Sequence, residues 1–364
     1  MRNLLRRSWL FVLVSMGCAA PRPTAYVTAP FVVSATADPA CVPPANGSHG
    51  VDDAAVCGLE QPYSDSTADI LGRPDPLKGL VLESQASRPY DFVVLLSIDG
   101  FRPDAISART PTLLRLKQEA TWADQAFTIA RSLTLPSHAA MVSGVDVDLH
   151  GVDFNAYRPG FGTIRFPSVM QVAQRAGLQV GMFVAKYKLI HLIDPGSIEA
   201  FRVGGIRCER VADQATEFIA QAQAGFAFVH FSETDAAGHR YGWMTGRYLQ
   251  AAARADRCAG LILDAVARRD DPERTLLIIT SDHGGNGKHH LGANRDCRQI
   301  PWIGNSARLA PAQSIAREIS TMDTAATVLA ALGLPIPHGT VGSPVIEVLA
   351  GGAPESPIVL QAQP

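Results

Sequence analysis

The clearest pattern along the chain is a series of short apolar runs separated by longer stretches of mixed polarity. Four of these runs contain no aspartate, glutamate, lysine or arginine, and they cover residues 92–97, 179–185, 226–231 and 276–280. Uninterrupted runs of this length, bounded by turn-forming residues, are typical of strands that are buried on both faces. A shorter run at residues 300–303 predicts one more strand.

The stretches between the apolar runs have the spacing of amphipathic helices. The predicted helices span residues 111–120, 168–176, 213–224, 248–268 and 321–332. Pro111 suits a first helical turn, and Gly177 and Gly333 follow the ends of two of the helices. Strands that alternate with helices in this way predict an α/β fold, with a mainly parallel central sheet and helices on both faces.

The first residues have a different pattern, which is typical of a targeting segment. A positively charged start, MRNLLRRS, precedes the apolar run WLFVLVSM, which is too short to span a bilayer. Gly17 and Cys18 follow, and this order resembles a bacterial lipoprotein signal in which Cys18 becomes the lipidated first residue. Ser15 replaces the leucine usual in such signals, so cleavage by ordinary signal peptidase stays an alternative.

These observations divide the chain into four parts. We expect a signal peptide at residues 1–17, a poorly ordered tether rich in Pro, Ala, Ser and Thr at residues 18–88, one globular domain at residues 89–350 and a tail at residues 351–364. Export implies an oxidising compartment, where cysteines pair. Cys41 and Cys57 can close a local loop, and one of Cys208, Cys258 and Cys297 would then stay free.

Charge narrows the possible partners. The net charge is −2 and no basic stripe is present, so binding of nucleic acid through charge alone is not expected. The predicted partner is a small molecule, and the only predicted link to a membrane is a lipid anchor at Cys18.

Acidic residues follow three of the predicted strands. Asp99, Asp235 and Asp282 each come at or shortly after the carboxyl end of an apolar run. One such aspartate is common turn chemistry, but three of them, two with histidines nearby, are harder to explain in that way. Because parallel strands share one carboxyl edge, where open α/β sheets bind ligands, we expect these side chains to converge.

Histidines complete a set of metal-ligand candidates. His283 is adjacent to Asp282, His239 follows Asp235 by four residues, and a Gly-rich loop carries His289 and His290. We expect the helix after the third strand to begin near Gly238. Mixed Asp/His ligation without thiolate favours a catalytic site for two divalent ions, most often Zn²⁺, with Mn²⁺ or Fe as alternatives.

A hydroxyl group completes the predicted chemistry. Pro136 suits a first helical turn, so we expect Thr134 to lie at a helix N-terminus, where backbone N–H groups favour an anion. A threonine hydroxyl becomes a useful nucleophile when a divalent ion lowers its pKa, and a phosphoryl group suits this environment.

The motifs, taken together, resemble the alkaline phosphatase superfamily, most closely its type I phosphodiesterase/nucleotide pyrophosphatase branch. The matching segments occur in the family's order and cover about 250 residues. They are SIDGFRPD (97–104), SLTLPSHAAMVSG (132–144), HGVDFN (150–155), SETDAAGHRYG (232–242), TSDHGGNGKHH (280–290), IPWIG (300–304) and TMDTAATVLAALGLPIP (321–337).

The resemblance implies a role for each matching residue. Thr134 would be the nucleophile and a metal ligand, with Asp99, Asp282 and His283 on one ion and Asp235, His239 and His290 on the other. His289 and His338 are the alternatives to His290. Asn155, Lys186 and Lys188 would contact the substrate. By contrast, His138 and His230 are interpreted as structural histidines.

The implied activity is hydrolysis of phosphodiester or pyrophosphate bonds through a phospho-threonine intermediate. Phosphomonoesterase or phosphonate hydrolase activity is an alternative, because the elements that read a nucleobase in the longest relatives are not recognisable. Sulfatases of the superfamily need Cys or Ser where this chain has Thr134, which disfavours that activity. The alternative of another class is a non-catalytic, metal-binding surface lipoprotein.

Overall fold

The computed structural model describes residues 88–194 and 196–349, together with the backbone of residues 359–360. The predicted signal peptide, most of the tether, Cys41, Cys57 and nearly all of the predicted tail lie outside these described residues. Within the described part of the chain, no helix combines the length and apolar character that crossing a membrane requires.

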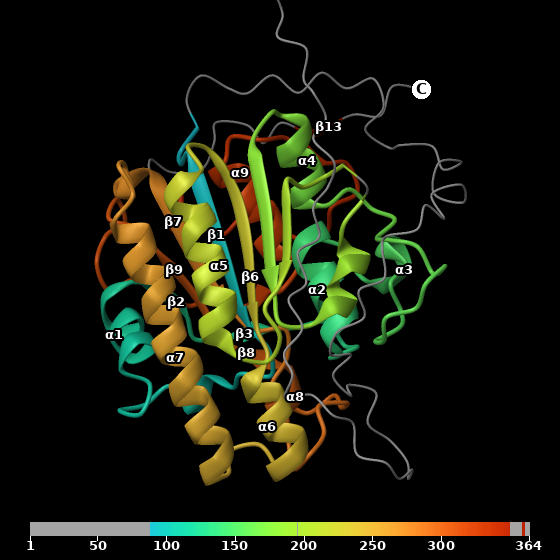
Figure 1. The fold of residues 1–364 in the computed structure, drawn as a ribbon, viewed down its shortest axis with the longest axis vertical. Coiled ribbons are helices and arrows are strands. Elements are labelled where there is room, and N and C mark those ends of the chain that lie inside the picture. Colours follow the sequence, from blue (N-terminus) through green and yellow to red (C-terminus); the bar gives the residue numbers. More distant parts are fainter. Residues whose placement is uncertain (1–87, 195, 350–358, 361–364) are drawn as a thin grey trace, which may run out of the picture. The chain divides into compact units, whose positions relative to one another are not determined.

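An eight-stranded sheet forms the centre of the fold, in the order β10-β2-β9-β7-β1-β6-β4-β5 (Figure 1). Its middle strands are the four apolar runs: β1 (Phe92–Ile98), β4 (Gln179–Val184), β6 (Gly225–Phe231) and β7 (Thr275–Thr280). The pairs β7–β1, β1–β6 and β6–β4 are all parallel, as is the outer pair of β4 with β5 (Ala200–Val203). The predicted α/β fold with a mainly parallel sheet is therefore confirmed.

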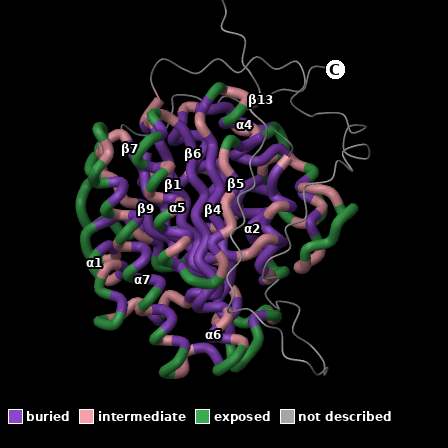
Figure 2. The backbone as a smooth tube through the Cα atoms, in the orientation of Figure 1, coloured by how far each residue is buried: buried purple, intermediate pink, exposed green. Residues whose placement is uncertain are grey.

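Helices cover both faces of this sheet because the side chains of each strand alternate between the faces. On one side, Val93 and Leu95 of β1 share a core with α2 (Thr134–Ser143), α4 (Val169–Arg175) and α9 (Asp323–Ala331). On the other side, Phe92, Val94 and Leu96 share a core with α1 (Pro111–Glu119), α5 (Cys208–Gln221) and α7 (Gly246–Ala267). Figure 2 shows the resulting continuous burial of the central strands.

The remaining elements are short, and several were not predicted. They are β2 (Thr121–Ala123), β3 (Ala126–Phe127), α3 (Val147–His150), α6 (Glu233–Tyr241), α8 (Arg295–Arg298), β10 (Ser314–Ile315), β11 (Ile319–Ser320), β12 (Ile336–Pro337), β13 (Val359–Leu360) and the 3-10 turns Pro103–Ala105, Tyr187–Leu192, Pro272–Arg274 and Ile346–Val348. Two- and three-residue strands carry too few side chains for a recognisable alternation.

Two predicted elements were wrong in detail. The single strand at residues 300–303 is in fact two strands, β8 (Gln299–Ile300) and β9 (Trp302–Asn305), which belong to different sheets. β8 pairs antiparallel with β3, and β9 pairs antiparallel with both β2 and β7. Pro301 separates them because it cannot donate a ladder hydrogen bond. In addition, the helix predicted at residues 213–224 begins earlier, at Cys208.

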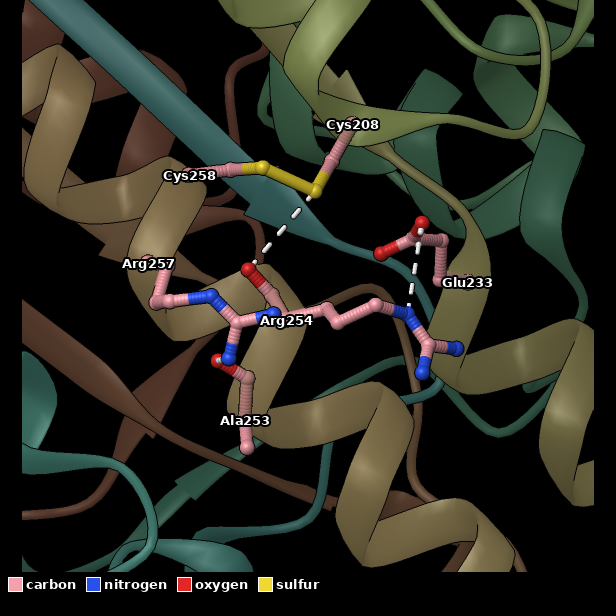
Figure 3. Close-up of a disulfide and its surroundings, with 6 residues drawn as sticks. All are labelled: Cys208, Glu233, Ala253, Arg254, Arg257 and Cys258. Carbon is pink, nitrogen blue, oxygen red and sulfur yellow. Dashed lines mark hydrogen bonds and ion pairs between the residues drawn. A yellow bond between two sulfur atoms is a disulfide. The ribbon is translucent and has the colours of Figure 1, made fainter.

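A disulfide joins the first residue of α5 to the middle of α7. Cys208 and Cys258 are bonded, and Cys297 is free and buried, which resolves the alternatives left open by the sequence. Figure 3 shows this disulfide with Glu233, the first residue of α6, beside it. The crosslink therefore lies next to the start of the helix that contributes Asp235 and His239.

Candidate functional site

Three aspartates lie at the carboxyl edge of the central sheet, as predicted. Asp99 directly follows β1, Asp282 follows β7 by two residues, and Asp235 lies in α6, just after β6. Because β1 is hydrogen-bonded in parallel to both β6 and β7, these three chain segments are neighbours. The aspartates are 1% exposed or less. Burial of so many acidic groups at one place requires compensating positive charge.

The third aspartate is positioned by a helix rather than by a loop. The prediction that this helix begins near Gly238 was wrong, because α6 begins at Glu233 and contains both Asp235 and His239. An acidic residue in the first turn of a helix is favoured by the helix dipole. One turn separates the two residues, so they share a face, and His239 Nε2 lies 3.3 Å from Asp235 Oδ1.

The potential ligand atoms form two overlapping groups. Asp99, Asp282 and His283 make one, and Asp235, His283 and His290 make the other, with all ligand atoms of a group within 4.8 Å of one another. The His290 ring stacks on the His283 ring at 3.8 Å between centroids and lies 4.9 Å from the ring of His239.

The structure also separates the alternatives for the last histidine. His290 is buried in the cluster, whereas His289 and His338 are exposed. His289 pairs through its backbone with Asn286 in an isolated bridge. Of the three candidates, His290 is therefore the one that the fold brings to the aspartates.

The donor atoms at this edge fit a metal site. Within the described residues, buried side-chain atoms of Asp99, Thr134, Asp235, Asp282 and His283 have no hydrogen-bond partner, although buried polar atoms normally have one. These atoms are Asp99 Oδ1, Thr134 Oγ1, Asp235 Oδ1, Asp282 Oδ2 and His283 Nε2. Oxygen and imidazole nitrogen together are the ligand set of catalytic Zn²⁺.

The orientation of the histidines supports the same conclusion. The Nδ1 atoms of His239, His283 and His290 each lie within hydrogen-bond distance of a backbone carbonyl oxygen, at 3.1, 2.8 and 2.6 Å. A carbonyl only accepts, so each Nδ1 carries the proton and each Nε2 presents its lone pair. Metal-binding histidines are held in this way by a partner on the other ring nitrogen.

Thr134 is the first residue of α2, and Leu133 is the N-cap. The prediction that Thr134 lies at a helix N-terminus, with Pro136 in the first turn, is therefore confirmed. Few backbone donors of this turn are available to an anion: Pro136 has no N–H, the Leu135 N–H donates to Asn155 Oδ1 at 2.9 Å, and the Ser137 N–H donates to the Leu133 carbonyl. The Thr134 side chain itself is buried.

Two sets of contacts connect Thr134 with the aspartate and histidine cluster. His138 Nδ1 donates to the Thr134 carbonyl at 2.7 Å and lies 3.5 Å from Asp282 Oδ2. In the preceding loop, the Ser132 hydroxyl donates to the His290 carbonyl at 2.5 Å, and His290 Nδ1 donates to the Ser132 carbonyl at 2.6 Å. Through His138 and Ser132, the segment that carries Thr134 is thus connected with Asp282 and His290.

The two predicted substrate lysines have different surroundings. Lys188 Nζ donates to Asn155 Oδ1 at 3.2 Å, so these two predicted substrate residues are neighbours beside α2. Lys186 Nζ instead lies 2.9 Å from Asp99 Oδ2 and 2.7 Å from Asp235 Oδ2, within the acidic cluster.

Electrostatics differ sharply among the aspartates. Burial alone would raise the pKa of Asp99, but Lys186 and His230 hold it well below its ordinary value. Burial and the neighbouring Asp99 charge raise the pKa of Asp282 to about 7. Burial also lowers the pKa of His290 to about 3, so its imidazole is neutral and able to act as a ligand.

Two contacts of this site were missed in the sequence. His230, interpreted as structural, donates from Nε2 to Asp99 Oδ2 at 2.9 Å. His138 accepts from the Ser97 hydroxyl at 2.8 Å while it holds the Thr134 carbonyl. The sequence held one signal for these contacts, because Ser97 and His230 are both polar residues near the end of an apolar run. In the structure these two residues are paired neighbours on β1 and β6.

Comparison with known proteins shows the family of the chain. The sequence profile of the family described as type I phosphodiesterase/nucleotide pyrophosphatase matches residues 93–295, more than half of the 364-residue chain. The chain belongs to this family. The match confirms the resemblance read from the motifs. The matched range includes Thr134, the other six assigned ligands and the three candidate substrate residues, whereas the alternative ligand His338 lies outside it.

Individual relatives are more distant. The human ectonucleotide pyrophosphatase/phosphodiesterase family member 7 is 26% identical over 245 residues, which cover 57% of this chain and 50% of that protein. The venom phosphodiesterase of Naja atra is 25% identical over 235 residues, covering 57% of this chain and 28% of that protein. The chain thus spans half or less of the length of these curated relatives.

Solved structures share the fold. Human ectonucleotide pyrophosphatase/phosphodiesterase 5 has a TM-score of 0.58 at 14% identity, covering 71% of this chain and 100% of that chain. The phosphonate monoester hydrolase from Silicibacter pomeroyi has a TM-score of 0.57 at 15% identity, covering 73% of this chain and 78% of that chain. At this identity the likeness shows the alkaline phosphatase-like architecture alone.

Proposed function

We propose that this protein hydrolyses phosphodiester or pyrophosphate bonds of small molecules, with Thr134 as the nucleophile and two divalent metal ions as cofactors. The observation that carries the proposal is a set of buried ligand atoms, the Thr134 hydroxyl among them, that have no hydrogen-bond partner within the described residues. Family membership supports the reaction class, because relatives are named phosphodiesterases and pyrophosphatases.

The reaction is a double displacement. The Thr134 oxygen bonds to phosphorus, the bond from phosphorus to the leaving group breaks, and the leaving group departs with the electron pair and takes up a proton. Water then bonds to phosphorus, the bond to the Thr134 oxygen breaks, and the threonine hydroxyl regains a proton. Phosphate or a phosphomonoester is released.

The metal ligands follow from the two groups of donors. We assign Asp99, Asp282, His283 and Thr134 to one ion and Asp235, His239 and His290 to the other, and we propose Zn²⁺, with Mn²⁺ or Fe as alternatives. When bound, such ions lower the pKa of a hydroxyl and offset charge on phosphoryl oxygens.

The chain's own residues orient the reacting groups. His138 holds the Thr134 carbonyl, which restricts the first turn of α2 and so the direction of the nucleophile. We assign Asn155 and Lys188, which contact each other beside Leu135, to binding a phosphoryl oxygen or the remainder of the substrate. Burial of Thr134 limits the access of water to the nucleophile.

The assay compares a phosphodiester, a phosphomonoester and a phosphonate monoester, all with p-nitrophenol as leaving group. We expect the diester to be hydrolysed fastest by the zinc-loaded protein and Thr134→Ala to lower its rate at least about a thousandfold. Intact-mass analysis of rapidly quenched protein should show one added phosphoryl group, absent from Thr134→Ala. Turnover of none of the esters by protein that holds zinc would leave the non-catalytic metal-binding protein as the better description.

We also propose that the protein is exported to the bacterial periplasm or cell envelope and anchored through a lipid on Cys18, with no nucleic-acid partner. The support is the order of charged, apolar and small residues at the start of the sequence. Mass spectrometry of the mature N-terminus checks the anchor: a lipidated Cys18 is expected, and an unmodified N-terminus created by ordinary signal cleavage would contradict it.

A further inference from the structure

Lys186 lies between the two groups of metal ligands. It follows β4 and caps the 3-10 turn Tyr187–Leu192, and its side chain is 15% exposed. Its ammonium lies 2.9 Å from Asp99 Oδ2, on the β1 side of the cluster, and 2.7 Å from Asp235 Oδ2, on the α6 side. Through its contacts, one side chain joins the first group of ligands to the second.

The oxygens that Lys186 contacts are not those available to the ions. It contacts Oδ2 of Asp99, which also accepts from His230 Nε2, and Oδ2 of Asp235. The second oxygen of each carboxylate, Oδ1, is buried and has no hydrogen-bond partner among the described residues. Each aspartate can therefore keep its contact with the ammonium while Oδ1 binds an ion.

We propose that Lys186 is a positioning residue for the metal centre rather than a substrate contact. This proposal rests on the metal site of the proposed function. In it, the ammonium of Lys186 turns Asp99 Oδ1 and Asp235 Oδ1 toward their respective ions. The same contact holds the two like-charged aspartates together. Loss of Lys186 should therefore weaken both ion sites at once, although it directly binds neither ion.

Charge repulsion between Lys186 and the ions would change the metal affinity in the opposite direction. An ammonium close to two divalent ions repels them, so its removal would strengthen metal binding if charge alone decided the outcome. Hydrogen-bond partners of ligating carboxylates usually matter more, and their loss lowers metal affinity by roughly 10- to 100-fold. Removal of Lys186 would also strengthen metal binding if its ammonium merely replaces the ions when they are absent.

The experiment measures metal binding by the full chain, not turnover. Metal-free wild type, Lys186→Met, Lys186→Arg and the matched control Lys188→Met are titrated with Zn²⁺ by calorimetry. The visible spectrum of each Co²⁺-loaded protein reports ligand geometry. Lys188 precedes Leu189 in the same 3-10 turn and contacts Asn155, so its substitution removes the same charge without touching Asp99 or Asp235.

We expect Lys186→Met to weaken both zinc sites about tenfold or more and to change the cobalt spectrum. Lys186→Arg, which retains charge and donors, should recover most of the affinity, and Lys188→Met should bind zinc as wild type does. Unchanged or tighter binding by Lys186→Met overturns the proposal. If that variant fails to fold by circular dichroism, Lys186→Gln, whose shorter and uncharged side chain removes the ammonium contact with both aspartates, is titrated instead and must show weakening at both sites.

The outcome is separable from that of the proposed function. Wild-type protein that binds two zinc ions but cleaves no ester would refute the enzyme while leaving the role of Lys186 intact if its variants bind zinc weakly. Conversely, an active enzyme whose Lys186→Met variant keeps both zinc affinities would refute only the role of Lys186. A wild type that binds no zinc would overturn both.

Discussion

Gly100 offers the sharpest test of how the candidate site is built. It follows Asp99 in the left-handed region of the backbone, with φ of 69°. Its N–H donates to Asp282 Oδ1 at 3.1 Å, and its carbonyl accepts from Trp243 Nε1 at 2.8 Å and Tyr248 Oη at 2.9 Å. This one residue therefore contacts the segment after β7 and helix α7, and it also lies beside α6.

An added methyl group would meet the backbone of α6. In Gly100→Ala, the Cβ would lie 2.9 Å from Asp235 Cα and 3.2 Å from Asp235 N. A non-glycine residue in the left-handed region costs about 1 kcal/mol, and overpacking against backbone adds roughly 1–3 kcal/mol. We therefore expect the free energy of unfolding to fall by about 3 kcal/mol and zinc binding at Asp235 to weaken.

The matched control is Gly177→Ala. Gly177 has a similar φ of 75°, but an added Cβ would meet nothing within 4 Å. The free energy of unfolding of this variant should fall only by the cost of a non-glycine residue in the left-handed region, about 1 kcal/mol. Denaturant unfolding of both variants measures the difference as a shift of the midpoint at constant slope. Equal losses would refute the reasoning, because backbone strain would then account for the whole effect and the contact with Asp235 for none.

Three further predictions concern stability. Reduction of the Cys208–Cys258 bond, which spans 50 residues, should lower the free energy of unfolding by about 4 kcal/mol in the chain-entropy account, measured by denaturant unfolding with and without reductant; a loss below about 1 kcal/mol would contradict it. Zinc at a hundred times its dissociation constant should stabilise the protein by about 2.7 kcal/mol per site, and this gain should disappear in chelator; a melting temperature indifferent to zinc would argue against the site. Hydrogen bonding to Arg274, and the charges of Arg274 and Arg88, lower the pKa of Asp91 in the folded protein. The contribution of Asp91 to the free energy of unfolding is therefore present above the unfolded-state pKa near 4, and it is lost as the pH falls through the lower folded-state pKa. Asp91→Asn should thus destabilise the protein by up to about 1 kcal/mol at pH 7 and by progressively less below pH 4, and a pH-independent difference would refute this.

Much of the fold could be predicted because the central strands are long and apolar. β1, β6 and β7 are buried along their whole length, so their residues need no alternation and form unmistakable runs. The edge elements could not be predicted, because β10 and β11 have two residues each and depend on partners distant in the sequence. Their pairing is tertiary information.

The candidate ligands were predictable for a related reason. Parallel strands deliver their carboxyl ends to one edge, so an aspartate just after such a strand has only a small region in which to lie. The helix that holds Asp235 was predicted with the wrong start because SETDAAGH mixes turn-forming and helix-forming residues. Tertiary contacts decide there: the Trp243 indole lies directly over Gly238 and Gly285, where a Cβ would approach it to 2.5 and 2.2 Å.

The residues around the ligands were the least predictable part, and the reason is geometric. Whether His230 reaches Asp99 depends on the register of β6 against β1, which pairs His230 with Ser97 and Phe231 with Ile98. A shift of one residue would turn the imidazole to the opposite face of the sheet. The same dependence applies to Lys186, whose position follows from β4 lying beside β6. Identifying the aspartate ligands from a sequence therefore requires only the ends of the strands, whereas identifying the residues that orient those ligands requires the register between them.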